Sequence, residues 1–488
     1  MKRNPFANVW ERGGGECGYI HMKAFLIPLL LACAAAGRPA MPSPATDAKL
    51  NIVVIMADDL GWKDLHCYGN AQIDTPYLDQ LAKEGMRFTD AYAAAPVCSP
   101  TRAAMMTGLS PARLRLTNHA PGNPDGFSLE GSNLQEAENV RHLESSYITI
   151  AERLKEAGYA TAHIGKWHLS YVARNARSGV AEADLQPEKQ GFDRNVGGSA
   201  RGGPASYFSP YKNKMLRDGK EGEYLPERLA EEAIAFVTES REEPFFLNWW
   251  PYSVHYPLQA LEPTIEKYRA RKGIKNPTYA AMIEGMDRAI GRFLAALDDA
   301  GLRESTLVIF NSDNGGYNGD NRPLRGFKGM IFEGGIRVPW IVRWPGVVEA
   351  GTTCATPVIS MDCYPTILEA AGIEEEPGKI LDGESIFPLL KQTGGLEREA
   401  IFFHYPNYAF HRRNRLASAI RSGNHKLIQR YDDGSIELYN LAEDIGEEHN
   451  LVTRFPKLAK QLDGKLEKWL REVDACLPTR GKPGTKRN

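Results

Sequence analysis

The chain has 488 residues, enough for one large hydrophobic core and a smaller second unit, because single cores stop growing near roughly 250–300 residues. Hydrophobic residues make up 42% and charged residues 25%, as in soluble globular proteins. A formal net charge of −2 excludes a general positive field that would draw the chain to nucleic acid, and we expect no such partner. Any anionic ligand must therefore be held by local charges.

The first 46 residues have the features of an upstream extension followed by a signal peptide. Lys23 precedes an apolar run, Ala24–Ala36, which ends in small residues and is too short for a membrane span. Met22 is an alternative start to Met1, so we exclude the residues before it from the fold. We predict an exported protein, periplasmic or secreted, without a transmembrane span; lipoprotein anchoring at Cys33 is the alternative.

The cysteines point to one reactive group. If Cys17 and Cys33 leave with the leader, five of the seven cysteines remain, and an odd number leaves at least one thiol unpaired. In an exported protein an odd cysteine suggests a reactive group, and the context of Cys98 makes it the candidate. Pairing among the other four stays open. The five are Cys67, Cys98, Cys354, Cys363 and Cys476.

Four short apolar runs predict buried parallel strands, each followed by polar side chains. Asp58 and Asp59 follow the first run, and equivalent polar residues follow the other three. Because ligands bind beyond the carboxyl ends of the strands in open α/β sheets, we expect these side chains to converge. The predicted strands are Asn51–Met56, Ala160–Ile164, Phe245–Trp250 and Thr306–Phe310.

Helical patterns alternate with these strands, with apolar residues three and four positions apart. Alternation of strands and helices predicts an α/β fold with a mostly parallel central sheet flanked by helices. The predicted helices are Tyr77–Glu84, Ile148–Ala157, Glu227–Ser240 and one around Tyr279–Ala300.

The pattern changes after about Leu396 to short alternating strands, which predict a smaller antiparallel sheet. A final amphipathic stretch, Phe455–Val473, predicts a helix over one face of that sheet. We therefore expect a catalytic domain over residues 47–395, a C-terminal subdomain over 396–478 and a disordered tail over 479–488. The predicted strands are Ala417–Arg421, Lys426–Tyr431 and Ile436–Tyr439.

The most specific signal is Cys98–Arg102, with the sequence CSPTR, which resembles the C-x-P-x-R signature of the sulfatase family. The segment fits a loop entering a helix, and a helix N-terminus favours anions. Four further motifs occur in the order of that family, so the resemblance extends over roughly residues 51–450. They are Asp58–Gly61, Gly165–His168, Ser312–Gly315 and Gly326–Gly329.

Four oxygen donors follow two of the predicted strands: Asp58, Asp59, Asp313 and Asn314. Such ligands suit a hard cation and not zinc, and we expect them to share one ion. The resemblance implies that this ion is calcium, with magnesium as the alternative, and that Cys98 completes the shell. It also implies that a formylglycine-generating maturation enzyme oxidises Cys98 to formylglycine, whose hydrated aldehyde is the nucleophile.

Cationic donors are needed around the sulfur because its nonbridging oxygens carry negative charge in the transition state. The resemblance assigns Lys166 and Lys328 to sulfate contacts, and Arg102 to orienting the formylglycine diol. A general acid should protonate the leaving alcohol, and the candidates are His255, in a His-x-Pro setting, and Lys328.

The remaining proton transfers are assigned by resemblance. His168 is the expected base when formylglycine sulfate loses a proton and ejects sulfate. Asp313 is the expected group that activates the diol in the first step.

These observations predict a sulfatase with the alkaline-phosphatase-like fold, a sulfuric ester hydrolase acting on a sulfated saccharide. Two alternatives stay open: a phosphate or phosphonate monoester hydrolase on the same fold, and a catalytically silent saccharide-binding homologue. The glycine-rich loop at Arg201, the loop at Arg113–His119 and the basic run His411–Arg415 are further candidate substrate contacts outside the predicted site.

Overall fold

The computed structural model describes residues 50–172 and 181–481, so the expected leader and the lipoprotein cysteine lie outside the described residues. Its central element is an eight-stranded sheet with the order β10-β2-β9-β8-β1-β7-β5-β6. Only β9 runs antiparallel to its neighbours, so the sheet is mostly parallel, as predicted. The bounds are β10 (Thr352–Cys354), β2 (Met86–Phe88), β9 (Trp340–Arg343), β8 (Thr306–Ser312), β1 (Asn51–Ala57), β7 (Phe245–Trp250), β5 (Ala160–Gly165) and β6 (Arg194–Val196).

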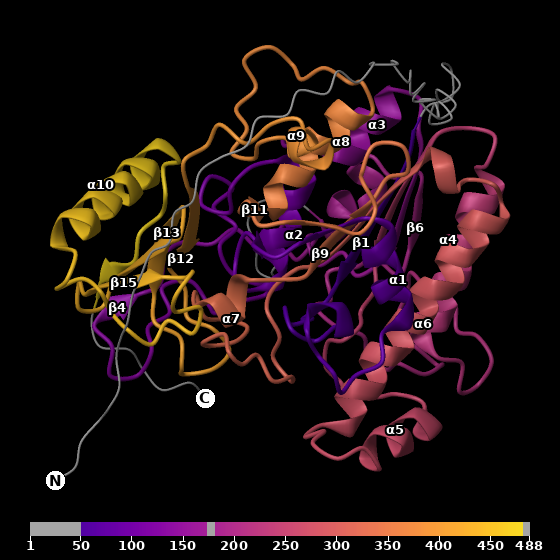
Figure 1. The fold of residues 1–488 in the computed structure, drawn as a ribbon, viewed down its shortest axis with the longest axis horizontal. Helices are drawn as coiled ribbons and strands as arrows, with labels where there is room; N and C mark the ends of the chain where they lie inside the picture. Colours follow the sequence, from indigo (N-terminus) through magenta and orange to yellow (C-terminus); the bar gives the residue numbers. More distant parts are fainter. Residues whose placement is uncertain (1–49, 173–180, 482–488) are drawn as a thin grey trace, which may run out of the picture. The chain divides into compact units, whose positions relative to one another are not determined.

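Both faces of the sheet are buried: every residue of β1, β7 and β8 is buried, and most of these residues are apolar. In β1, Val53 and Ile55 face one hydrophobic cluster, while Ile52 and Val54 face the other. Figure 1 shows the helices divided between the two sides in the same way. The first cluster includes α1 (Pro76–Glu84), α4 (Leu225–Glu239), α5 (Glu262–Arg269) and α6 (Pro277–Asp299); the second includes α2 (Cys98–Thr107), α3 (Ile150–Glu156), α8 (Cys363–Ala370) and α9 (Phe387–Leu390).

Local capping explains where several helices begin. Thr149 and Glu152 form a reciprocal capping box at the start of α3. Helix α6 starts at Pro277 after Asn276, whose side chain accepts a hydrogen bond from the Tyr279 amide. The predicted helices match observed ones, with ends that differ by at most two residues.

A four-stranded antiparallel sheet follows, and α10 covers one of its faces (Figure 1). Its other face packs on α2 and on α7 (Glu333–Ile336). The predicted strands and final helix are confirmed, although the domain boundary near residue 396 stays a prediction. The bounds are β12 (Ile401–Tyr405), β13 (Ala417–Ser422), β14 (His425–Arg430), β15 (Ile436–Asn440) and α10 (Pro456–Glu472).

Two short strand pairs complete the described structure: β3 (Ala91–Tyr92) with β11 (Val358–Ile359), and β4 (Leu134–Gln135) with β16 (Thr479–Arg480). The start of the expected disordered tail is therefore ordered, because its backbone pairs with β4; residues 482–488 lie outside the described residues. All five described cysteines are free thiols. No helix in the described ranges is long and apolar enough to cross a bilayer.

Candidate active site

The predicted site residues meet at the carboxyl ends of four neighbouring strands, β8, β1, β7 and β5. Helix α2 adds Cys98 from one side, and the loop before α7 adds Lys328. Parallel neighbours end at the same edge of a sheet, so polar residues that follow separate strands come together there. The strand-end residues are Asp58, Asp59, Lys166, His168, His255, Asp313 and Asn314.

Cys98 is the first residue of α2 and is buried. Its Sγ lies 3.3 Å from Lys328 Nζ, 3.7 Å from Asp58 Oδ1 and 3.9 Å from Asp59 Oδ1. Burial, reinforced by Asp313, raises the pKa of the Cys98 thiol to about 12. The side chain therefore lies at a helix N-terminus among charged groups, in a setting where an unmodified thiol stays protonated.

Each lysine of the site holds one aspartate of the Asp58-Asp59 pair. Lys166 Nζ donates to Asp58 Oδ1 and Oδ2 at 2.8 and 2.9 Å, and Lys328 Nζ lies 2.6 Å from Asp59 Oδ1 and 2.8 Å from Oδ2. Burial raises the pKa of Asp58 to about 8, against the effect of Lys166. Burial also raises the pKa of Asp59, but the charges of Lys328 and His255 outweigh this effect, and the pKa of Asp59 lies below its usual value.

Arg102 forms a buried salt bridge with Asp313. Its Nε and Nη2 donate to Asp313 Oδ2 at 3.0 and 2.7 Å, Nη1 donates to the Lys166 carbonyl at 2.9 Å, and the guanidinium lies 5.0 Å from the Trp250 ring centre. The other oxygen of Asp313 accepts the Asp59 amide at 3.1 Å. Arg102 therefore orients Asp313, and its expected contact with a diol at residue 98 stays a prediction.

The site contains a cluster of groups that could hold a metal ion. Single ligand atoms of Asp58, Asp59, Cys98 and His255 all lie within 4.8 Å of one another. Asn314 donates Nδ2 to Asp59 Oδ1 at 2.8 Å, but its buried Oδ1 has no hydrogen-bond partner among the described residues. A buried carbonyl oxygen without a partner is costly unless a ligand satisfies it. His255 joins this cluster although the sequence did not predict it as a ligand.

His255 presents an acceptor to the aspartates. Its Nδ1 lies 2.8 Å from the Tyr256 carbonyl, which can only accept, so we assign the ring proton to Nδ1. Nε2 then faces Asp59 Oδ2 at 3.8 Å. Burial, followed by Lys328, lowers the pKa of His255 to about 3, so the ring must gain a proton before it can act as an acid.

His168 has the opposite tautomer. Its Nε2 lies 2.5 Å from the Ala120 carbonyl and carries the proton, while the buried Nδ1 has no partner among the described residues. Burial and Lys166 hold the pKa of His168 well below its usual range. A neutral ring with an unpaired nitrogen has the form that a base requires.

Two glycines that the predicted site omitted hold both histidine rings. A Cβ on Gly202 would lie 2.7 Å from His168 Cε1, and one on Gly203 would lie 2.7 Å from His255 Nδ1. His168 and Asp59 also adopt left-handed backbone conformations, with φ of 60° and 63°. The sequence indicated the Gly-Gly pair beside Arg201 as a candidate substrate contact, but it could not show that these glycines lie against the two histidines.

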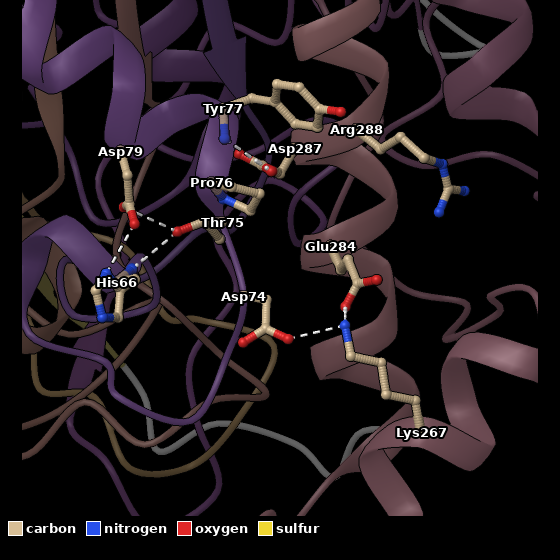
Figure 2. A pocket seen from close by; sticks show the side chains of 10 residues that line it. All are labelled: His66, Asp74, Thr75, Pro76, Tyr77, Asp79, Lys267, Glu284, Asp287 and Arg288. Atoms are coloured by element: carbon tan, nitrogen blue, oxygen red, sulfur yellow. Dashed lines mark hydrogen bonds and ion pairs between the residues drawn. The ribbon is translucent and has the colours of Figure 1, made fainter.

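A second polar hollow, of about 570 Å³, lies near the start of α1 and beside α6, away from the predicted site. Figure 2 shows two groups of charged side chains in contact, one of His66 and Asp79 and one of Lys267, Asp74 and Glu284, whereas Arg288 points away from both. Lys267 pairs with Asp74 at 2.8 Å and Glu284 at 2.6 Å, and His66 Nδ1 lies 2.7 Å from Asp79 Oδ2. Arg288 pairs with Glu227 at 2.8 Å, so these charges are paired within the protein without a ligand.

Comparisons with known proteins agree with this geometry. The family described as "Sulfatase" matches residues 50–373, and "N-sulphoglucosamine sulphohydrolase, C-terminal" matches residues 326–474. A sulfatase of Formosa agariphila is 31% identical, over 86% of this chain and 89% of its own length. Human arylsulfatase A is 33% identical, over 87% of this chain and 86% of its own.

Among solved structures, Ps i-CgsB, in complex with k-i-k-neocarrahexaose, superposes with a TM-score of 0.72 at 30% identity, covering 86% of this chain and 93% of its own. The family match spans the strands that supply the site, and both relatives cover most of the chain. Together with the CSPTR segment at the start of α2, these matches show that the chain belongs to the sulfatase family of sulfuric ester hydrolases.

Proposed function

We propose that this enzyme hydrolyses the sulfate monoester of a sulfated saccharide, with a formylglycine made from Cys98 by a maturation enzyme. The observation that carries the proposal is the position of Cys98 Sγ at the start of α2, within 3.3 to 3.9 Å of Lys328, Asp58 and Asp59. A geminal diol there would lie among cationic donors and beside the oxygen cluster.

We propose one calcium ion as the cofactor, with Asp58, Asp59, Cys98, Asp313 and Asn314 as its ligands. With Asp58 ionised, as a metal ligand must be, Asp58, Asp59 and Asp313 balance the charges of Arg102, Lys166 and Lys328, so a divalent ion would leave the site positive toward an anionic ester. When bound, the ion would polarise the nucleophile and the sulfate. The unpartnered Asn314 Oδ1 supports this assignment.

In the first step, one diol oxygen attacks sulfur while its proton passes to Asp313. The bond between sulfur and the bridging oxygen breaks, and the alcohol leaves with a proton from His255 or Lys328. Asp59 and Cys98 raise the pKa of Lys328 despite its burial, so Lys328 stays charged at neutral pH and can also hold a sulfate oxygen.

In the second step, His168 takes the proton of the remaining hydroxyl through its unpartnered Nδ1. The carbon–oxygen double bond of the aldehyde forms as the bond to the sulfate oxygen breaks, and sulfate departs. Water then adds to the aldehyde to restore the diol. No water attacks sulfur in this sequence.

A saccharide substrate is supported by the relatives. Ps i-CgsB was solved with a neocarrahexaose, and human N-acetylgalactosamine-6-sulfatase, whose name gives a sulfated sugar, is 32% identical over 72% of this chain. The test is sulfate release from sulfated galactans, fucans and glycosaminoglycan fragments, alongside matched phosphate and phosphonate esters. We expect sulfate release from at least one saccharide. Phosphate release without sulfate release would favour the phosphomonoester alternative.

A further inference from the structure

The chemical centre is closed on most sides, and this limits where a substrate can enter. Asp58, Asp313, Arg102 and Lys166 have no exposed surface. The side chain of His255 is 23% exposed, and that of Lys328 is 7% exposed. A sulfate ester must therefore enter on the side of these two residues, and its alcohol part stays outside there.

Exposed aromatic side chains gather at this opening. Among the described residues, five aromatic side chains are strongly exposed, and one of them, Tyr256 at 68%, follows His255 directly. Phe410, at 37%, has its ring centre 5.7 Å from Lys328 Nζ, and Tyr317, at 44%, lies 5.1 Å from the Phe410 ring. The other two, Tyr77 and Phe455, lie elsewhere, in α1 and before α10.

Phe410 belongs to a built aromatic cluster, which we call the aromatic rim: Tyr317, Phe327, Phe410 and His411. Phe327 contacts Tyr317 at 5.8 Å and His411 at 4.9 Å between ring centres, and Phe410 contacts His411 at 4.9 Å. His411 Nε2 also lies 2.8 Å from the Lys328 carbonyl. The rim therefore joins the loop after β8 to the loop after β12, beside a predicted sulfate contact.

The loop that carries Phe410 is firmly held below its exposed tip. Buried Asn414 donates Nδ2 to the Asn407 carbonyl at 2.9 Å, and its Oδ1 accepts the Ala409 amide at 2.9 Å. Thr117 Oγ1 donates to Asn407 Oδ1 at 2.6 Å. Phe410 therefore keeps part of its apolar ring in contact with water although its loop is anchored, and an exposed aromatic patch of this kind is a common feature of binding surfaces.

A cation lies at the outer edge of the rim. The Arg413 guanidinium lies 5.5 Å from the Phe327 ring centre, and no carboxylate of the described residues pairs with it. Its neighbour Arg412 lies 3.6 Å from Glu130, and Arg415 pairs with Asp432 at 2.7 Å. Arg413 is thus available to an anionic group that lies beyond the ester.

We propose that the aromatic rim binds the sugar ring that carries the scissile sulfate, with Arg413 meeting a second anionic group on the same oligosaccharide; this rests on the proposed sulfatase function. The apolar C–H face of a pyranose packs on the aromatic rings of Phe410 and Tyr317 while its sulfate reaches Lys328. The rim thereby selects polyanionic saccharides over small sulfate esters.

The test compares Phe410→Ala, Tyr317→Ala and Arg413→Ala with Phe455→Ala, which removes an exposed phenylalanine before α10. The probes are methyl sulfate and tetrasaccharides of carrageenan and chondroitin sulfate with one or two sulfates per repeat. Relative to its own rate on methyl sulfate, Phe410→Ala should lose about tenfold in kcat/KM on the best tetrasaccharide, mostly through KM, and Phe410→Trp should recover it. Arg413→Ala should lose more on the doubly sulfated substrate than on the singly sulfated one.

A binding measurement tests the aromatic rim separately from the proposed sulfatase function. Calorimetry measures association of the same tetrasaccharides with Cys98→Ala and with Cys98→Ala/Phe410→Ala, so it works even if no ester is turned over. Weaker binding by the double variant supports the rim even when catalysis is absent. Equal affinities, or equal losses by Phe410→Ala on methyl sulfate and on the saccharide, would overturn the rim as a sugar site.

Discussion

Two clusters of buried charges in this protein look alike in composition and differ in what they leave unsatisfied. Beside the small sheet, Lys426 Nζ lies 2.9 Å from Glu333 Oε1 and 2.8 Å from Glu447 Oε1. The second oxygens accept from the Tyr92 hydroxyl and the Glu333 amide, both at 2.7 Å. We call Glu333, Lys426 and Glu447 the structural ion cluster, because every carboxylate oxygen in it lies within 2.9 Å of a protein donor, although Glu447 Oε1 meets Lys426 as an ion pair without hydrogen-bond geometry.

The site at the strand ends is as deeply buried, but Asn314 Oδ1 and His168 Nδ1 have no partner among the described residues. It also contains Asp59 and His168 in left-handed backbone conformations, whereas the structural ion cluster has Glu447 alone at φ 53°. Burial and charge therefore do not identify an active site. The feature that distinguishes the strand-end site is the pair of unpartnered atoms, Asn314 Oδ1 and His168 Nδ1, among its charged groups.

The largest expected effect is the loss of turnover in Cys98→Ala, a substitution in the strand-end site. Turnover should fall by at least about 10⁴-fold because the nucleophile is lost, while the melting temperature changes little. The matched control is Cys363→Ala, which removes another buried thiol, in α8, and should keep turnover. Sulfate release by Cys98→Ala at the wild-type rate would contradict the role of residue 98.

Lys426→Ala should lower the stability of the protein and leave turnover by the folded enzyme unchanged. Removing the ammonium leaves two buried carboxylates without their cation, which costs about 3–5 kcal/mol in the free energy of unfolding. Denaturant titration measures this loss, with the exposed Lys468→Ala in α10 as the control. A stable Lys426→Ala protein with impaired turnover would show that the two clusters are not separate in function.

His255→Ala tests which group protonates the leaving alcohol. If His255 is the acid, turnover of a sulfated saccharide should fall by about 10²-fold or more, and turnover of an activated aryl sulfate should fall much less. The measurement is kcat on both substrates. Equal losses on both would remove His255 as the acid and leave Lys328.

Substitution of Asp287, which lines the hollow of Figure 2, should have the smallest effect of the four. We expect it to change the pH dependence of stability and not turnover. Its carboxylate accepts the Leu78 amide at 2.8 Å, and burial raises its pKa to about 7. Between about pH 4 and 7 the folded protein therefore holds a proton that the unfolded chain has lost, so this group makes stability fall as pH rises.

In Asp287→Asn, the decrease in the free energy of unfolding between about pH 4 and 7 should become smaller by about 1 kcal/mol per pH unit. Denaturant midpoints at pH 5 and pH 7 measure it, and the exposed Asp299→Asn, on the same helix, is the control. An unchanged slope would show that Asp287 is charged throughout.

Much of this account could be predicted from the sequence because its signals are local. The apolar run Asn51–Met56 and the polar pair after it follow from strand burial, and the CSPTR segment begins a helix as expected. Partners far apart in sequence could not be predicted. Neither the contact of Gly202 with His168 nor that of Phe410 with Lys328 has a periodicity or spacing that would reveal it.

The antiparallel strand β9 was missed for a similar reason. Trp340–Arg343 has only three apolar residues before a buried arginine, and its direction depends on pairing with β8 and β2. The start of the C-terminal tail is ordered only because Thr479–Arg480 pairs with β4. In both places tertiary pairing decided the structure, and composition did not.

The central claim is that residue 98 acts as formylglycine, and peptide mass spectrometry across Cys98 tests it most directly. The protein would be produced together with a formylglycine-generating enzyme, and its sulfate release measured on the same preparation. We expect an aldehyde in place of the thiol, with sulfate release that rises with the converted fraction. A fully active preparation in which residue 98 is still cysteine would contradict the account.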